Sequence, residues 1–166
     1  AQFQRTLTSA GSRYDRYLAG ETTALSAAEL RGADLFYSER GECFHCHATA
    51  LFTDNLFHNI GLDAEVAGTG RASVTGRPLD DGCFKTPTLR NVALTAPYMH
   101  DDRFATLDEV VAFYSEGVVT SDSLDTLIHI GGFQLDEGDR ADLVAFLGSL
   151  TDEDFVQNPA LVEERR

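Results

Sequence analysis

The stretch GECFHCHATA, residues 41–50, separates Cys43 from Cys46 by two residues and places His47 directly after the second cysteine. Three kinds of site use such a pair of cysteines: a structural zinc site, a redox dithiol and the covalent attachment point of a heme. Each kind needs different surroundings in the chain, so identifying the site also decides the fold.

The cysteine count and the flanking sequence separate these three interpretations. The chain has three cysteines, and with Cys83 as the third, a tetrahedral zinc site would still need His45, His47 or a distant residue. A thioredoxin-like dithiol lies between a strand and a helix, whereas the residues before Cys43 are typical of a helix that ends in a loop. The pattern C-x-x-C-H fits two thioether bonds and an imidazole on heme iron. The sequence therefore favours one covalent heme c, with zinc as the weaker alternative.

Three helices are predicted around this motif, over about residues 26–37, 106–117 and 136–150. The first two begin with capping boxes, S-A-A-E and T-L-D-E, and Gly117 is placed to end the second. Apolar residues of the second helix recur at the spacing of one helical face: Leu107, Val110, Val111 and Tyr114. This face is expected to be buried.

The tract between the first two helices, residues 48–105, is interrupted so often by glycine and proline that no sustained period survives. It is too long for an idle loop and is expected to wrap around something. A brief hairpin is predicted between VVTS, residues 118–121, and LIHIGGF, residues 127–133, although neither alternates well. The predicted fold is mainly α, a cytochrome c-like single-heme domain with a long irregular wrapping loop.

Composition restricts the partners. The 166 residues suit one domain, and their formal net charge of -14 disfavours nucleic acid, because no basic stripe faces the phosphates. A basic protein partner is more plausible. The apolar runs are far shorter than the roughly 20 residues of a membrane span, and no leader-like segment opens the chain.

A longer stretch carries a family resemblance. The run FKTPTLRNVALTAPYMHDDRFATLDEVVAFYSEG, residues 84–117, resembles the C-terminal half of bacterial di-heme cytochrome c peroxidases and of the related MauG-type enzymes. The stretches FQRTL (3–7), RYDRYLAG (13–20) and LFTDNLFHNIGL (51–62) are also similar to that family, so the resemblance extends from Phe3 to Leu150.

The resemblance implies two heme domains in one chain, one that reacts with peroxide and one that passes electrons. This sequence holds a single C-x-x-C-H motif and begins where the family's chain crosses into its second domain. We therefore expect one c-type cytochrome domain over residues 1–166, the electron-transfer half. It divides into an inter-domain-like segment (1–25), a heme core (26–150) and a C-terminal tail (151–166).

The resemblance also bears on the sixth ligand of the iron. Met99 is the single methionine, and a thioether opposite histidine is common in cytochromes c. The position that matches the family's ligand is instead Tyr114, and MauG-type enzymes resemble this sequence there, with tyrosine on the iron. A phenolate favours ferric iron, so this ligand implies a low potential. The alternatives are Met99, an open position, and Tyr114 as a core aromatic.

Several other residues are candidates for the surroundings of the heme. His58 and His100 match family positions and are expected either to hydrogen-bond a propionate, to tune the iron, or to serve structure alone. Lys85 and Arg90 are among few cations and are expected near a propionate. The resemblance further implies a calcium on the backbone carbonyls of Thr95 and Pro97, with a proline-containing turn as the alternative.

Two functions from different classes remain open. The chain is either part of a di-heme peroxidase or MauG-type oxidase, partnered by a second heme domain or subunit and supplied by a small redox protein, or a stand-alone mono-heme electron carrier. A structural zinc protein is the third alternative. No set of acid and base residues for cleaving peroxide can be assembled, so the chain alone is expected to turn over feebly. Thioether attachment takes place outside the cytoplasm, which predicts an exported, periplasmic protein whose leader has been removed.

Overall fold

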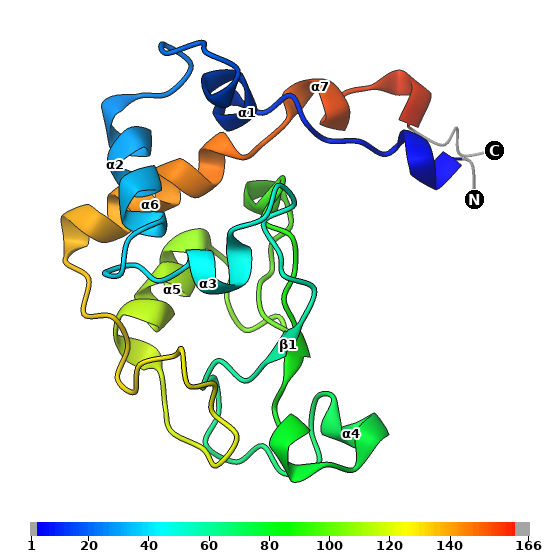
Figure 1. Cartoon of the computed structure of the whole chain (residues 1–166), viewed down its shortest axis with the longest axis vertical. Helices are drawn as coiled ribbons and strands as arrows, with labels where there is room; N and C mark the ends of the chain where they lie inside the picture. The colour runs from blue at the N-terminus through cyan, green and yellow to red at the C-terminus, as the bar shows by residue number, and fades with distance from the viewer. Residues whose placement is uncertain (1–2, 162–166) are drawn as a thin grey trace.

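The computed structural model describes residues 3–161 and is mainly helical (Figure 1). Its elements, in chain order, are η1 (Phe3–Thr6), α1 (Arg13–Leu18), α2 (Ala27–Phe36), α3 (Phe44–His47), β1 (Phe57–His58), α4 (Ala72–Thr75), η2 (Pro78–Asp80), β2 (Phe84–Lys85), η3 (Val92–Leu94), α5 (Leu107–Ala112), η4 (Phe113–Gly117), α6 (Glu137–Ser149), α7 (Glu153–Val156) and η5 (Pro159–Leu161). The predicted mainly helical class is confirmed.

The three predicted helices are present and begin where their caps place them. In α2, the Ser26 hydroxyl accepts from the Glu29 amide and the Glu29 carboxylate accepts from the Ser26 amide. The same reciprocal box begins α5 at Thr106 and α6 at Asp136. Each cap satisfies backbone N–H groups that have no partner inside the helix and contributes about 1 kcal/mol.

The core lies where α2 crosses α6 (Figure 1). Phe36 of α2 and Phe146 of α6 are fully buried, with ring centroids 5.1 Å apart. Gly32 permits this close crossing, because a Cβ there would lie 2.0 Å from the carbonyl oxygen of Asp142. Phe52, which follows the heme motif, packs against both phenylalanines. The motif is thereby fixed to the helical core.

The irregular tract contains the one sheet that residues 3–161 form, and the predicted hairpin is wrong. Strands β1 and β2 pair antiparallel, with Phe57 opposite Lys85 and His58 opposite Phe84. Residues 118–121 have no regular structure, and residues 127–133 contain turns and bends instead. Gly131 and Gly132 both have φ of 81°, which bends the chain out of extended geometry. The short strands form where two distant segments of the tract pair, and not where β-branched residues are frequent.

Helix α5 is shorter than predicted, because the chain changes to a π-helical turn, η4, at Phe113. Residues 133 and 134 hydrogen-bond to this turn. The Phe133 amide donates to the Tyr114 carbonyl at 3.0 Å, and the Gln134 amide donates to the Ser115 carbonyl at 2.8 Å. Carbonyls used in this way are not available for the usual α-helical pattern. Such π turns occur frequently at functional sites.

The N-terminal segment lies against the same core. Tyr14 of α1 contacts Phe146, with ring centroids 5.1 Å apart, and belongs to the buried cluster. The Gly11 amide donates to the carboxylate of Asp152, the N-cap of α7, so the segment before α1 lies beside the start of α7 (Figure 1). The division at residues 25 and 150 stays a prediction; residues 1–2 and 162–166 of its outer segments lie outside the described part. None of the helices within residues 3–161 is long and apolar enough to span a membrane.

Candidate heme attachment site

The C-x-x-C-H motif forms one helical turn. Cys43 is the N-cap of α3, Cys46 and His47 lie within the helix, and the His47 amide donates to the Cys43 carbonyl at 3.0 Å. Residues i, i+3 and i+4 share one face of a helix. The turn therefore presents two sulfur atoms and one imidazole on the same side, as attachment to a single flat group requires.

His47 is held in one tautomer. Its Nδ1 lies 2.6 Å from the carbonyl oxygen of Phe52, so Nδ1–H is the donor and Nε2 carries the free lone pair. Burial lowers the pKa of His47, which keeps the ring neutral at pH 7. A neutral imidazole with Nε2 free and Nδ1–H fixed by a carbonyl has the form that a proximal iron ligand needs.

The two thiols are unlike those of a redox pair. Burial raises the pKa of Cys43 to about 12 and that of Cys46 to about 11, whereas a reactive C-x-x-C pair needs a lowered pKa. Among residues 3–161, the cluster that joins a cysteine to other potential metal ligands is Cys46 with Asp54 and His58. A zinc site with both motif cysteines is not assembled there. These observations favour thioether attachment.

Tyr114 lies in the π-helical turn η4, and its ring packs against that of Phe113. Burial raises the pKa of its hydroxyl, and the Cys43 and Cys46 thiols contribute to the same shift. Met99 lies half-buried in the turn between Tyr98 and Phe104, with φ of 71°. Tyr114 and Met99 as iron ligands both stay predictions.

His58 lies beside the motif, between two carboxylates. Its Nδ1 is 2.6 Å from Asp125 and its Nε2 is 2.8 Å from Asp54. Burial opposes protonation of His58, but the bonds to Asp125 and Asp54 outweigh it and raise its pKa. The Asp54 amide donates to the Cys46 carbonyl at 2.8 Å, which ties this triad to α3. Both ring nitrogens are engaged, so a propionate bond from His58 would require another arrangement.

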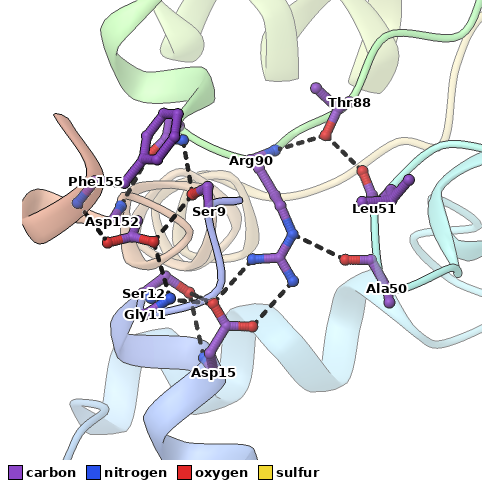
Figure 2. A network of polar contacts seen from close by, with 11 residues as sticks. Ser9, Gly11, Ser12, Asp15, Ala50, Leu51, Thr88, Arg90, Asp152 and Phe155 are labelled. Atoms are coloured by element: carbon purple, nitrogen blue, oxygen red, sulfur yellow. Dashed lines mark hydrogen bonds and ion pairs between the residues drawn. The ribbon is translucent and has the colours of Figure 1, made fainter. Parts of the chain in front are cut away.

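The predicted cations have separate surroundings. Arg90 makes two bonds to Asp15, at 2.8 and 3.0 Å, and its Nε donates to the Ala50 carbonyl at 2.9 Å (Figure 2). The exposed Lys85 donates to the Thr86 carbonyl. The structure therefore places Arg90, not Lys85, against the segment that follows the motif. Propionate contacts for these two residues stay predictions.

The remaining predicted residues lie on the surface. His100 is exposed and stacks on Phe84, with ring centroids 3.7 Å apart. Thr95 and Pro97 are also exposed, on either side of the Ala96–Pro97 bond. The Thr95 hydroxyl donates to the Val92 carbonyl. A calcium on the backbone of Thr95 and Pro97 stays a prediction.

Four contributors to the site were not predicted from the sequence: the Phe52 carbonyl and the carboxylates of Asp15, Asp54 and Asp125. A backbone carbonyl has no side-chain signature. The aspartates are among 27 acidic residues and nothing local distinguishes them, except that S-R-Y-D at residues 12–15 matches a capping box. That pattern was the available signal for Asp15.

Comparisons with known proteins agree with this geometry. No protein-family profile matches the chain. MauG of Methylorubrum extorquens is 39% identical over 151 residues, which are 90% of this chain and 42% of that protein. A cytochrome c peroxidase of Denitromonas iodatirespirans is 36% identical over 184 residues, covering 91% of this chain and 48% of the relative.

A solved structure shares the fold over nearly the whole chain. It is described as a MauG-like protein associated with microbial copper homeostasis, with a TM-score of 0.89 and 39% identity, and the match covers 99% of this chain and 55% of that one. A diheme peroxidase of Burkholderia thailandensis matches with a TM-score of 0.67 and 28% identity, over 88% of this chain and 47% of the other. The chain therefore belongs to the family of MauG proteins and di-heme cytochrome c peroxidases, and it spans about half the length of these relatives.

Proposed function

We propose that this chain is the C-terminal, electron-transfer heme domain of a di-heme MauG-type oxidase or cytochrome c peroxidase. The observation that carries the proposal is the turn at residues 43–47, with two thiols and a His47 ring whose Nε2 is free. Family membership supports the same role. When bound, the heme supplies a one-electron redox centre.

His47 and Tyr114 divide the coordination between them. Nε2 of His47 would bind the iron of a bound heme, and the Nδ1–H bond to the Phe52 carbonyl would increase the electron donation of the ring. The Tyr114 hydroxyl has a raised pKa in its buried position, so its phenolate form needs a cation beside it, and ferric iron is such a cation. A histidine and a phenolate together stabilise the ferric state. We therefore expect a low potential.

With His47 and Tyr114 both bound, a heme iron would have six ligands and no free position for peroxide. Peroxide chemistry is accordingly assigned to a second heme domain or subunit, which this chain partners, and the chain alone is expected to be nearly inactive. Net charge of -14 makes a basic redox protein the complementary electron donor. The long tract at residues 48–105 is proposed to wrap around the heme. Periplasmic location follows from thioether attachment.

A stand-alone mono-heme electron carrier is the second candidate. One observation favours it: the N-terminal segment packs into the chain's own core through Tyr14 and Asp15. A domain with its own core has no structural need of a neighbour. In this case Tyr114 and His47 would keep their roles, but no peroxide-reactive partner would exist.

Calcium is a proposal of narrower scope. The carbonyl oxygens of Thr95 and Pro97 are hard ligands on an exposed turn, which suits a cation that takes further ligands from a neighbouring domain. Chelation should then lower the thermal stability of a two-domain particle. It should leave the stability of this chain by itself unchanged.

The native mass of the purified particle, taken with its covalent heme count, tests the proposed function. A second heme-bearing domain or polypeptide in the particle is the expected result. A particle with one heme and this chain alone would favour the electron carrier. Absence of covalent heme from protein produced with an intact maturation system would overturn both candidates.

A further inference from the structure

We propose that the Arg90–Asp15 ion pair is a positioning device for the proximal histidine. It holds the turn of residues 50–53, whose Phe52 carbonyl fixes the His47 ring, and so links helix α1 to the iron ligand. The inference rests on the proposed function, because it takes His47 as that ligand. It concerns how much electron density the His47 ring donates to the iron, which the identity of the ligands alone does not decide.

Every carbonyl of the turn at residues 50–53 accepts a hydrogen bond from outside the turn. The donors, in order, are Arg90 Nε, the Thr88 hydroxyl, His47 Nδ1 and the Thr49 hydroxyl. Arg90 and Thr88 come from a segment almost 40 residues further along the chain (Figure 2). The turn is therefore clamped by a segment that is distant from His47 in the sequence.

Phe52 needs such a clamp. Its φ is 52°, in the left-handed region that residues other than glycine seldom adopt. Its buried ring packs against Tyr14 and Phe36, and the Arg90 guanidinium carbon lies 5.6 Å from the ring centroid. Arg90 thus contacts the turn twice, at the Ala50 carbonyl and over the Phe52 ring. Both contacts favour the unusual conformation that aims the Phe52 carbonyl at His47.

The position of Arg90 is set in turn by Asp15. The Arg90 side chain is 11% exposed and that of Asp15 is 17% exposed, and their two parallel hydrogen bonds fix the plane of the guanidinium. Burial opposes ionisation of Asp15, but bonds from Arg90 and Ser12 outweigh it and keep its pKa low. Asp15 also closes the capping box of α1 through Ser12. One carboxylate therefore joins the start of α1 to the clamp.

The strength of the Nδ1–H bond governs how much electron density the His47 ring gives to iron. A loosened turn weakens that bond, so the ferric state loses stabilisation and the midpoint potential rises. The ion pair is expected to act through geometry and not by touching the heme. Its loss should consequently shift the potential while the axial ligands stay in place.

The test compares midpoint potentials and ferric paramagnetic-resonance spectra of the full heme-loaded chain. Arg90→Gln and Asp15→Asn are each expected to raise the potential, and the double variant to match the larger single shift instead of their sum. Thr88→Val, which removes the bond that the hydroxyl donates to the Leu51 carbonyl and the bond that it accepts from the Arg90 amide, should give a smaller shift in the same direction. Arg90→Lys, which keeps the positive charge, should raise the midpoint potential less than Arg90→Gln does.

The matched control is Arg31→Gln. Arg31 also makes two bonds to a carboxylate, that of Asp142, at 2.6 and 2.7 Å, but this pair joins α2 to α6. It should leave the potential unchanged. The inference is overturned if Arg90→Gln and Thr88→Val both keep the wild-type potential and spectrum, or if Arg31→Gln shifts them equally. A wild-type chain without covalent heme would overturn the proposed function itself, and the inference with it.

Discussion

The crossing of α2 and α6 and the tract at residues 48–105 are stabilised in different ways. The crossing is held by capping boxes at both helix starts and by a buried aromatic cluster around Phe36 and Phe146. The tract has few buried side chains and is held by polar bonds between distant segments, such as Asp125 to His58 and Arg90 to Ala50. Helix packing supplies the frame, and long-range polar contacts set the conformation of the site.

Truncating Phe146 should be the most damaging change to the frame. Its side chain is 0% exposed and contacts the rings of Tyr14, Phe36 and Phe52. Phe146→Ala is expected to lower the free energy of unfolding by about 3–5 kcal/mol, because both burial and packing are lost. Urea unfolding followed by circular dichroism measures the loss.

The matched control for Phe146→Ala is Leu79→Ala, at a side chain that is 72% exposed. It should change the unfolding free energy by no more than about 0.5 kcal/mol. A similar loss in the two variants would mean that the aromatic cluster is not the stabilising centre of the frame.

Two glycine-to-alanine substitutions test the close packing of α2 against α6 by adding one methyl group. Gly32→Ala would place a Cβ 2.0 Å from the Asp142 carbonyl oxygen, so α2 and α6 must move apart. We expect a loss of about 1–3 kcal/mol. Gly148→Ala in α6 meets nothing within 4 Å and should gain about 0.5–1 kcal/mol from helix propensity. Thermal melts should therefore show a lower melting temperature for Gly32→Ala and a higher one for Gly148→Ala, each relative to wild type. Equal shifts in the two variants would contradict the tight crossing of α2 and α6.

The stability of the tract should depend on pH through the charge of His58. Because bonds to Asp125 and Asp54 raise the pKa of His58 in the fold, its protonated form contributes stability. That contribution is complete below the unfolded-state value near 6.5 and is lost as the pH rises through the higher folded-state pKa. His58→Gln should therefore cost about 1 kcal/mol at pH 6 and less at pH 9.

Unfolding by urea at several pH values measures this difference, with Ser26→Ala as reference. That variant removes a cap at α2 without removing a titrating group, so its deficit should stay constant over the same pH range. A His58→Gln deficit that grows with pH would contradict the stabilising role of the imidazolium.

The frame was largely predictable from the sequence, and the detail of the site was not. Capping boxes at Ser26 and Thr106 are local patterns, and C-x-x-C-H fixes its own geometry within one turn. The pairing of β1 with β2 joins segments about 27 residues apart, and neither strand is long enough to show alternation. The expected hairpin failed because Gly131 and Gly132 turn the chain.

The partner of Arg90 shows the limit more sharply. A cation in an acidic chain was expected at a heme propionate, but any of 27 acidic residues was an available partner. Which one lies nearest depends on how α1 docks on the core, a tertiary contact with no local signal. The π-helical turn at Phe113 was missed for a related reason, since its carbonyls are claimed by residues 133 and 134.

The most direct test of the site is the ferric absorption and paramagnetic-resonance spectrum of Tyr114→Phe beside wild type, with Met99→Leu as the matched variant at the alternative ligand. Covalent attachment through Cys43 and Cys46 should persist in all three proteins. The expected result is an altered ferric spectrum and a raised potential in Tyr114→Phe alone. An unchanged Tyr114→Phe spectrum would contradict Tyr114 as an iron ligand, and an altered Met99→Leu spectrum would then assign that role to Met99.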